Sequence, residues 1–337
     1  MQETYRTLQK EASIVIINYN GERFIRDLFV SLFRQTNKNF EILFVDNAST
    51  DHSIDVFREI MEEEYSEIPM TLISNKTNLG FCEGNNSGLK QCSGKYVIFL
   101  NNDTYLDENW FDELLIVMNM HQSIAICQSK LVEPKTGKLQ SIGGLHGVYG
   151  KGSSSNKIIS DGELISGFFY AVGASMIVRR EIIERIERFD KELFNGDVDL
   201  SWRIRLMGYQ IVTNPRSICY HYGGCTIAKF VLSTDHSYQI FREKLRILIK
   251  NYGSENLLKR LLMWYVVSFA YAMYLSLRNR KPHIFSWAKA LRWNAVNLKG
   301  TYSLRQKVQH LRNISDSKIE KYMLPYPSEM YELRRRL

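Results

Sequence analysis

The first 130 residues alternate short apolar runs with helical stretches, and this alternation limits the fold more than any other feature of the sequence. Buried strands are predicted at 13–18, 40–46, 70–74, 95–101 and 124–129, and helices near 22–35, 52–65, 84–92 and 108–121. Strands and helices that alternate at this spacing form βαβ units with neighbouring parallel strands. We therefore predict an α/β fold in which helices flank a mostly parallel sheet.

Short polar side chains follow three of these predicted strands. Tyr19 and Asn20 follow the first strand, Asp46 ends the second, and the run Asn101–Asp103 ends the fourth. In an open parallel sheet, ligands bind beyond the carboxyl ends of the strands. The sequence therefore predicts a binding site where these three strand ends meet.

Asp103 has two interpretations at this point. A carboxylate at a strand end, beside two asparagines, suits Mg²⁺ or Mn²⁺ that bridges a diphosphate. Alternatively, Asp103 or Thr104 caps the helix that follows. The residues alone leave both interpretations open.

The segment 78–88 is a strand-to-helix loop rich in glycine and asparagine. Backbone N–H groups at a helix N-terminus suit a phosphate group, and a plain connecting loop is the alternative. The segment has the spacing of neither GxxxxGK[ST] nor GxGxxG, so the sequence does not predict a P-loop or a dinucleotide-binding fingerprint.

Two aspartates near residue 200 differ in their expected roles. Asp199 is the natural N-cap of an amphipathic helix that carries Arg203 and Arg205, at least one of them on a solvated face. Asp197 has no capping role and is a candidate general base. His221 is a candidate metal or phosphate ligand, with a structural role as the alternative.

Seven motifs then occur in one order: IVIINYNG, FVDNASTD, NLGFCEGNNSGL, FLNNDT, GASMIVRRE, FDKELFNGDVDLSWRIRLMGYQI and YHYGG. Together they resemble the family-two glycosyltransferases, particularly the rhamnosyltransferase-like branch of surface-polysaccharide assembly, over residues 12–250. The resemblance implies a GT-A fold, a nucleotide-sugar donor, Mg²⁺ or Mn²⁺ as cofactor, and inversion at the anomeric carbon.

The resemblance also implies roles for individual residues. Asp103 matches the last aspartate of the family's DxD motif and His221 joins it on the metal, whereas Asn101 stands where many members have the first aspartate. Asp197 matches the expected base, with Gly196 where a Glu often lies and Asp199 in reserve. The residues expected on the nucleotide sugar are Tyr19, Asn20, Asp46, Asn78, Gly80, Asn85, Asn86, Asn102 and Arg203.

The charge of the chain is divided unevenly along its length. Residues 1–225 hold 23 basic and 29 acidic side chains, a net charge of −6, whereas residues 226–337 hold 21 and 7, a net charge of +14. Within this basic part, the apolar run 261–277 predicts a short transmembrane helix, a re-entrant helix or a buried core helix. The sequence therefore predicts two parts with different partners.

A second helical pattern follows that run. Its apolar stripe, with basic residues beside it, suits a helix lying in an anionic membrane interface. A core helix with a solvated basic face is the alternative, and the high apolar content disfavours nucleic acid as a partner. The stripe consists of Ile284, Trp287, Ala288, Leu291, Ala295 and Leu298, beside Lys289, Arg292 and Lys299.

These observations predict a catalytic part at 1–225 and a membrane-docking helical part at 226–337. The expected activity is transfer of a sugar, rhamnose first, from a UDP- or dTDP-linked donor to a polyprenyl-linked glycan at the cytoplasmic face of the membrane. The alternatives are a nucleotide-sugar or glycan-binding module without catalysis, and a nucleotidyltransferase on a similar sheet. Residues 301–337 are a candidate dimer contact. The five scattered cysteines indicate neither a disulfide framework nor a zinc knuckle.

Overall fold

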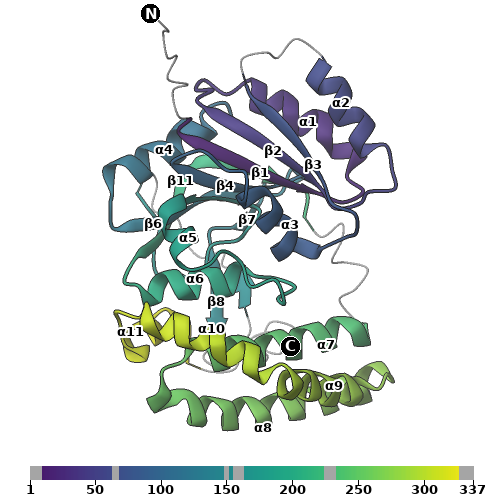
Figure 1. Cartoon of the computed structure of the whole chain (residues 1–337), viewed down its shortest axis with the longest axis vertical. Helices are drawn as coiled ribbons and strands as arrows, with labels where there is room; N and C mark the ends of the chain where they lie inside the picture. The colour runs from purple at the N-terminus through teal and green to yellow at the C-terminus, as the bar shows by residue number, and fades with distance from the viewer. Residues whose placement is uncertain (1–9, 63–67, 148–151, 155–162, 224–232, 326–337) are drawn as a thin grey trace, which may run out of the picture.

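The computed structural model describes residues 10–62, 68–147, 152–154, 163–223 and 233–325. An α/β part, built on one large sheet, is followed by a group of helices that lies below the sheet in the view of Figure 1. Two of the predicted segments lie partly outside the described residues: the helix near 52–65 includes 63–65, and the candidate dimer contact at 301–337 includes 326–337.

Among the described residues, the large sheet has nine strands in the order β3-β2-β1-β4-β10-β6-β11-β5, with β7 paired to β6. The first four strands in this order, β3, β2, β1 and β4, are parallel to one another. Strand β10 runs antiparallel to β4 and to β6, so the sheet is mixed. The predicted α/β fold with flanking helices is confirmed. The strands are β1 (Ala12–Asn18), β2 (Phe40–Asp46), β3 (Met70–Ser74), β4 (Tyr96–Asn101), β5 (Thr104–Leu106), β6 (Ile124–Val132), β7 (Leu139–Ser141), β10 (Ser175–Arg179) and β11 (Gln210–His221).

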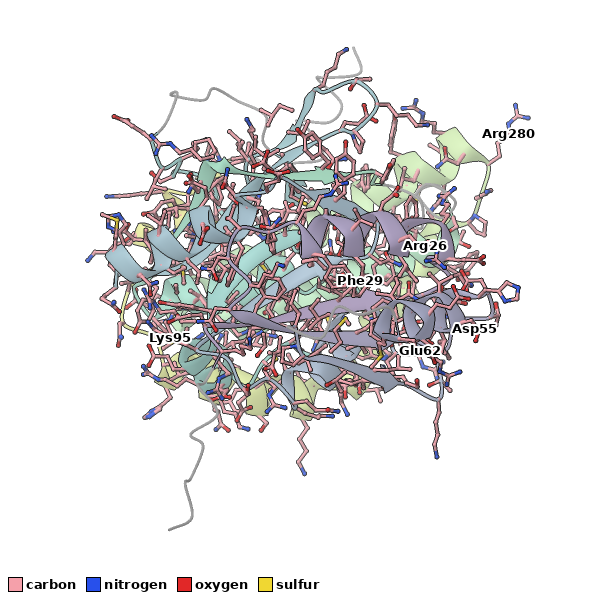
Figure 2. The ribbon with its side chains drawn as sticks, turned by 90° about the horizontal axis from the view of Figure 1, so that it is seen from above. Arg26, Phe29, Asp55, Glu62, Lys95 and Arg280 are labelled. Carbon is pink, nitrogen blue, oxygen red and sulfur yellow. The ribbon has the colours of Figure 1, made fainter. Side chains whose placement is uncertain are left out.

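Helices cover both faces of this sheet because its central strands are apolar on both sides. Along β1, Ile14 and Ile16 join the core beneath one helical layer, and Val15 joins the core beneath the other. Phe29, on the helical layer that covers Ile14 and Ile16, points from helix α1 toward the sheet, as Figure 2 shows. This pattern is typical of strands buried on both faces. The helices of this part are α1 (Glu22–Phe33), α2 (Ser53–Glu62), α3 (Gly80–Leu89), α4 (Trp110–Met120), α5 (Arg180–Arg185) and α6 (Asp197–Leu206).

The C-terminal helices share a core with the α/β part. Trp202 of α6 packs edge-on against Tyr252 with ring centroids 5.0 Å apart, and both rings are fully buried. The same cluster of buried side chains continues to Trp264. A boundary at 225/226 stays a prediction. The C-terminal elements are α7 (Thr234–Asn251), α8 (Ser254–Asn279), α9 (His283–Val296), α10 (Leu298–His310), α11 (Asp316–Glu320) and β12 (Met323–Leu324). Strand β12 joins two strands from the middle of the chain, β8 (Gly144–Gly147) and β9 (Gly152–Ser154), in a small sheet.

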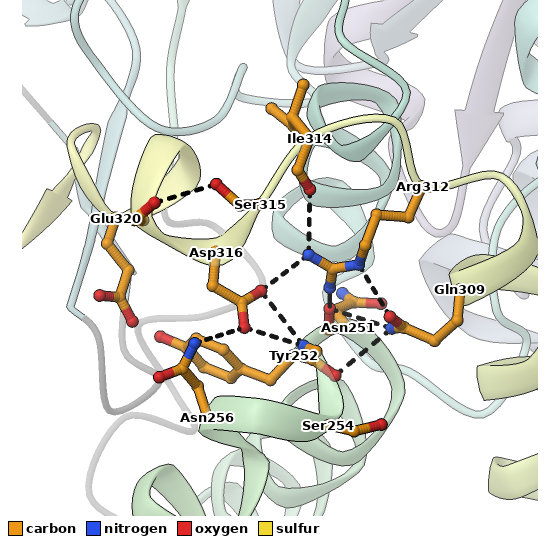
Figure 3. Close-up of polar contacts among 12 residues, drawn as sticks. Asn251, Tyr252, Ser254, Asn256, Gln309, Arg312, Ile314, Ser315, Asp316 and Glu320 are labelled. Atoms are coloured by element: carbon orange, nitrogen blue, oxygen red, sulfur yellow. Dashed lines mark hydrogen bonds and ion pairs between the residues drawn. The ribbon is translucent and has the colours of Figure 1, made fainter.

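Polar side chains from α10, α11 and the segment between them contact the corner between α7 and α8. Gln309 donates to the backbone carbonyl of Asn251, and Arg312 donates to the same carbonyl and to Asp316 (Figure 3). Asp316 in turn accepts the backbone N–H of Gly253 at 3.0 Å. These contacts satisfy carbonyls that the end of a helix leaves without intrahelical partners.

Helix α6 corrects the expectation of an amphipathic helix. All ten of its residues are buried, because β11 and α7 pack against it. The helix begins at Asp197, after Gly196 at the N-cap, so Asp199 lies inside the first turn and is not the cap. The arginines predicted on a solvated face are also buried: the side chains of Arg203 and Arg205 instead donate to buried acceptors.

A buried cluster of five charges ties α6 to the C-terminal helices. Lys250 lies 2.8 Å from Asp190 and 2.9 Å from Asp199. Arg246 pairs with Asp190 and Arg203 pairs with Asp199, each at 2.8 Å. All five side chains are at most 5% exposed. We call these residues the buried charge cluster.

Replacing Lys250 with Met is expected to lower the free energy of unfolding by about 2 kcal/mol, because Asp190 and Asp199 each lose one charged hydrogen-bond donor but keep an arginine partner. Denaturant unfolding measures the change. The matched control is Lys318→Met, since Lys318 is an exposed lysine of α11. A loss no larger than that of the control would contradict a stabilising role for the cluster.

The apolar stripe predicted on α9 turns partly inward. Trp287 is 6% exposed, donates to Ser268 of α8 at 2.9 Å and contacts the rings of Tyr265 and Phe269. The prediction that Trp287 lies on a membrane-facing side of α9 is therefore wrong, because α8 covers that side of the helix. Ile284 and Leu291 are also partly buried against the core, and Ala288, Ala295 and Leu298 are exposed.

Helix α8 contains the predicted apolar run 261–277, and it exposes more large apolar side chains than α9 does. It has 26 residues and is long and apolar enough to cross a membrane. Its buried residues recur every four positions along one side: Arg260, Trp264, Ser268 and Ala272. The exposed apolar side chains of the helix, which we call the α8 stripe, are Leu258, Leu262, Met263, Tyr265, Val266, Phe269, Met273 and Leu277.

Candidate functional site

Three strand ends meet through hydrogen bonds at one edge of the sheet. Asn18, at the end of β1, donates to Asp46 of β2 at 3.0 Å and accepts a hydrogen bond from Asn102 at 2.7 Å. Asp46 also accepts two hydrogen bonds from Ser49, one from its backbone N–H and one from its hydroxyl. Asp46 is 1% exposed, and its carboxylate accepts hydrogen bonds from residues of the loops that follow β1 and β2. It therefore holds these loops in place. The predicted meeting of Asp46 and Asn102 at this edge is observed.

Tyr19 and Asn20 lie on the loop that leaves β1. Asn20 has a left-handed φ of 52°, and its side-chain oxygen accepts the backbone N–H of Thr50 at 2.8 Å. Its own backbone N–H donates to Ser49 at 2.9 Å. Tyr19 is 43% exposed and stands at the rim of this edge. The loops after β1 and β2 are thus locked together, with one aromatic ring left accessible.

The segment 78–86 approaches the same edge through the loop before α3. Asn47 donates to the carbonyl of Gly80 at 3.0 Å, and Asn78 accepts the backbone N–H of Gly80 at 2.9 Å. Gly80 has φ +73°, a conformation that glycine adopts without strain. Asn85 and Asn86 are buried, and their amides donate to the carbonyls of Phe81 and Phe189. Both asparagines therefore hold backbone in place beneath the edge.

Asp103 and His221 form a pair beside these loops. Their Oδ1 and Nε2 atoms are 3.3 Å apart, and each side chain is 13% exposed. Asn101 also contacts His221 Nε2, at 3.4 Å. The helix-cap interpretation of Asp103 and Thr104 is wrong, because Thr104 begins β5 and α4 starts only at Trp110. The two predicted metal ligands are adjacent although 118 positions separate them in the chain.

Gln140 orients the imidazole of His221, and no pattern in the sequence indicated this role. Its side-chain oxygen lies 2.7 Å from Nδ1 of His221, so Nδ1 donates to this oxygen and Nε2 faces Asp103. An imidazole held by a second residue in this way is typical of metal-ligating histidines. One carboxylate and one imidazole fit a divalent cation whose other ligands are substrate phosphates and water.

Asp197 is the carboxylate with the environment expected of a base. It is 4% exposed, and its oxygens accept the backbone N–H groups of Val198 at 2.8 Å and Gly173 at 3.4 Å. Burial raises the pKa of Asp197 to about 6, and these backbone hydrogen bonds oppose the rise only in part. A carboxylate with this pKa is ionised at neutral pH and remains basic enough to accept a proton.

Asp199, the reserve candidate, has a different environment. Burial on its own would raise its pKa, but Arg203 and Lys250 outweigh burial and hold the pKa of Asp199 below its usual value. Asn251 donates to it as well, at 3.0 Å. Asp199 is therefore a weak base and a member of the buried charge cluster. Arg203, predicted on the nucleotide sugar, belongs to that cluster and does not join the strand-end residues.

Two further features lie beside Asp197. A Cβ at Gly196 would be 2.5 Å from Cys82 Sγ and 2.8 Å from a ring carbon of Phe189, so no side chain fits there without movement. Glu243 of α7 is 8% exposed and accepts the backbone N–H of Asn195 at 2.9 Å. Burial raises the pKa of Glu243 to about 8, and the charge of Asp197 contributes. Sequence reasoning missed Glu243, whose raised pKa favours the protonated form near neutral pH.

A family comparison decides the class of this protein. Residues 13–187, more than half of the chain, match the model described as Glycosyl transferase family 2. The chain belongs to this family. The matched segment contains the strand-end residues and Asp103, whereas Asp197 and His221 follow it in the chain.

Curated relatives of this glycosyltransferase match parts of the chain at modest identity. A glucuronosyltransferase of Methanococcus voltae, named for transfer to dolichyl N-acetyl-α-D-glucosaminyl phosphate, is 26% identical over 66% of this chain and 70% of its own length. An "Uncharacterized glycosyltransferase" of Haemophilus influenzae is 30% identical over 35% of this chain and 36% of its own. The match thus spans about a third of the first curated relatives.

Solved structures show the same fold at low identity. GalNAc-T7 with UDP, GalNAc and Mn²⁺ has a TM-score of 0.62 at 13% identity, covering 89% of this chain and 59% of that one. TarS 1–349 of S. aureus with UDP-GlcNAc has a TM-score of 0.58 at 17% identity, covering 93% and 89%. The mannosyltransferase PcManGT of Pyrobaculum calidifontis, with GDP-Man and Mn²⁺, has 0.55 at 17%, covering 90% and 86%. These likenesses support the GT-A fold.

Proposed function

We propose that this family-two glycosyltransferase is an inverting, metal-dependent enzyme that transfers a sugar from a nucleoside-diphosphate sugar to a lipid-linked glycan. One observation carries the proposal: an acid–histidine pair at the end of β4 accompanies a separate buried carboxylate, Asp197, whose pKa is raised. The pair is suited to a cation and Asp197 to a proton. Activation of an acceptor hydroxyl against a diphosphate leaving group requires both functions.

The proposed donor site lies at the edge where the three strand ends meet. Asp103 and His221 would hold a divalent metal, which supplies positive charge to the diphosphate when bound. Tyr19 would cover the base, since it is the exposed aromatic ring at the rim. The hydrogen-bonded group of Asn18, Asp46 and Asn102 would keep the nucleotide loops in place.

Asp197 is proposed to accept the proton of the acceptor hydroxyl while the hydroxyl oxygen attacks the anomeric carbon. The bond from that carbon to the diphosphate breaks in the same displacement, and its electron pair leaves with the diphosphate. A single displacement inverts the anomeric configuration. No second acid is required in this scheme, because the diphosphate leaves without protonation.

The identity of the donor is proposed as UDP- or dTDP-linked, with rhamnose first among the sugars. Support for UDP comes from the similar GalNAc-T7 and TarS structures, which hold UDP and UDP-GlcNAc. A panel of nucleotide sugars, with Mn²⁺ or Mg²⁺ and a lipid-linked acceptor, tests the proposal. Transfer from at least one donor is expected. Nucleotide binding without any transfer would instead indicate a binding module.

The acceptor is proposed to be membrane-bound, a polyprenyl-linked glycan at the cytoplasmic face. The dolichyl-linked acceptor in the name of the Methanococcus relative supports this proposal. The α8 stripe supports it independently. Its basic neighbours include Lys259 and Arg278, and no acidic residue occurs from 256 to 315. An apolar surface flanked by cations is what an anionic membrane interface binds.

Helix α8 is proposed to lie along the membrane surface. Its buried side packs against α9, where Trp287 bonds to Ser268. A spanning α8 would therefore carry α9, with Lys289 and Arg292, into the hydrocarbon, at a cost of several kcal/mol. Arg280, just beyond the end of α8, points away from the body of the molecule in Figure 2 and is exposed, so its guanidinium is accessible.

Charged substitutions in the α8 stripe should release the protein from anionic vesicles. Leu262→Asp with Val266→Asp removes two exposed apolar contacts, worth together about 3 kcal/mol or about 100-fold in affinity. Co-sedimentation with phosphatidylglycerol vesicles measures the loss. The matched control, Ile116→Asp with Met120→Asp, changes two exposed apolar residues of α4. Equal vesicle binding by the two double variants would contradict docking through α8.

A further inference from the structure

A pocket of about 660 Å³ lies between the loop that follows α5 and helix α10. Phe189 and Lys191 line it on the loop side, and Gly300 and Lys307 line it on the α10 side. In Figure 1, α10 runs below α6. Among the described residues, none of the strand-end residues, nor Asp103, Asp197 or His221, contributes to the lining. The pocket is therefore separate from the proposed donor site.

The buried charge cluster forms part of the lining of this pocket. Arg203, Arg246, Lys250 and Asp190 all line it, and Asp199 stands behind Arg203 and Lys250. Three cations thus share two carboxylates, which leaves one positive charge in excess within the cluster. A buried charge without a counter-charge is costly, and the adjoining pocket is the direction from which an anion can reach it.

Arg203 has a hydrogen-bonding position to spare. Its Nε donates to Asp199 at 2.8 Å and its Nη1 donates to the carbonyl of Ile186 at 2.5 Å. Its Nη2 has no hydrogen-bond partner among the described residues, although the side chain is only 5% exposed. Buried guanidinium nitrogens are almost always hydrogen-bonded, so this atom lacks an acceptor.

Further cations surround the pocket. Arg185, Arg188 and Lys191 come from the end of α5 and its loop, and Lys307 comes from α10, where it pairs with Glu187. The lining holds seven Lys and Arg residues against three Asp and Glu residues. Arg188 is held there by a left-handed backbone, with φ 65°, which non-glycine residues rarely adopt.

We propose that this pocket binds a phosphate-bearing anion whose oxygens accept a hydrogen bond from Arg203 and balance the excess charge of the cluster. Guanidinium groups match phosphate oxygens in geometry, and several cations around one pocket favour a multiply charged anion over a carboxylate. The anion comes either from a soluble phosphate ester or from the headgroup of an anionic lipid. The proposal does not depend on the chemistry of the donor site.

Calorimetric titration with inorganic pyrophosphate, at fixed ionic strength and with EDTA present, tests this site. The double variant Arg188→Ala with Lys191→Ala should weaken binding about 100-fold, because each of its two substitutions removes one charge-assisted hydrogen bond worth about tenfold in affinity. Lys135→Ala with Lys138→Ala removes two exposed lysines elsewhere and should leave the affinity unchanged. Loss of binding in Asp103→Ala but not in Arg188→Ala with Lys191→Ala would place the anion at the donor site and overturn the proposal.

A pair of variants at Gly300 tests the pocket without removing any cation. A Cβ at Gly300 meets no atom within 4 Å, so a side chain fits there. Gly300→Glu brings a carboxylate to the pocket and should weaken pyrophosphate binding about tenfold relative to Gly300→Gln, its uncharged match. Gly300→Glu should also melt at the higher temperature of the two, because it supplies the missing counter-charge. Equal affinity of the two variants would overturn the proposal.

Vesicles distinguish the two sources of phosphate. If the pocket takes a lipid headgroup, Arg188→Ala with Lys191→Ala will weaken binding to phosphatidylglycerol vesicles as well as to pyrophosphate. If it takes a soluble ester, only the affinity for pyrophosphate will fall. An unchanged affinity for both probes would overturn the proposal.

Discussion

Asp197→Asn is expected to lower the rate of sugar transfer by about 1,000- to 10,000-fold, the effect of removing a general base. Asparagine has nearly the same shape, and its single side-chain oxygen still accepts the backbone N–H of Val198, whereas the longer bond from Gly173 is lost because an amide NH2 cannot accept it. It cannot accept the proton of an acceptor hydroxyl. Initial rates with saturating donor and acceptor measure the change, and the affinity for the nucleotide sugar should stay within about twofold of the unmodified protein.

The comparison with Asp199 makes this result decisive. Asp199→Asn also removes one carboxylate of α6, but it leaves Arg203 and Lys250 with fewer partners and should act on stability. Full transfer by Asp197→Asn, together with abolished transfer in a folded Asp199→Asn protein, would move the base by two residues. Melting temperatures of both variants separate a folding defect from a catalytic one.

The pH dependence of transfer offers an independent check on the same residue. Because burial raises the pKa of Asp197 to about 6, the base is protonated below that pH and transfer should rise as the pH increases through about 6. The folded-state pKa lies above the unfolded value of 3.8, so ionising Asp197 destabilises the fold at higher pH. Asp197→Asn should therefore be the more stable protein above pH 6, by about 2 to 3 kcal/mol, and equal below about pH 4.

The sequence indicates the strand-end site because its signals are local. A buried strand and the polar residue that ends it are neighbours in the chain, so the pattern alone places Asp46 and Asp103. The assignment of His221 to the metal and of Asp197 as the base depends on the order of the family motifs along the chain, because both residues come from segments distant from the strand ends. Their proximity to the other residues depends on topology, which no short pattern contains.

Features that depend on distant partners could not be predicted in the same way. Gln140 contacts His221 across 81 positions, and Glu243 contacts Asn195 across 48. The charges of α6 suggest a solvated face because a sequence window contains Asp199 and Arg203 but not Lys250, which pairs with the cluster from α7. The apolar stripe of α9 suggests a membrane face for a similar reason, since only the fold shows that α8 covers Trp287.

Asp103→Asn is expected to lower transfer by about 1,000-fold, because the leaving diphosphate loses the charge held at this position. Asp103 is the single acid of the segment 101–104, so no neighbouring carboxylate in the segment can replace it. The loss should be accompanied by weaker binding of Mn²⁺, which electron paramagnetic resonance of the free ion detects without any turnover. Glu108→Gln, an exposed acid five residues later, is the matched control.

Gln140→Ala should reproduce this defect in a milder form. It removes the acceptor that orients His221, and the loss of such a supporting hydrogen bond costs about 10- to 100-fold in metal affinity. Excess Mn²⁺ should restore transfer in Gln140→Ala and should not restore it fully in Asp103→Asn. That difference follows from geometry: Gln140 acts through the imidazole, whereas Asp103 would contact the metal itself. Unchanged Mn²⁺ affinity in both variants would remove Asp103 and His221 from the proposed metal site and leave their pairing at 3.3 Å as a structural contact.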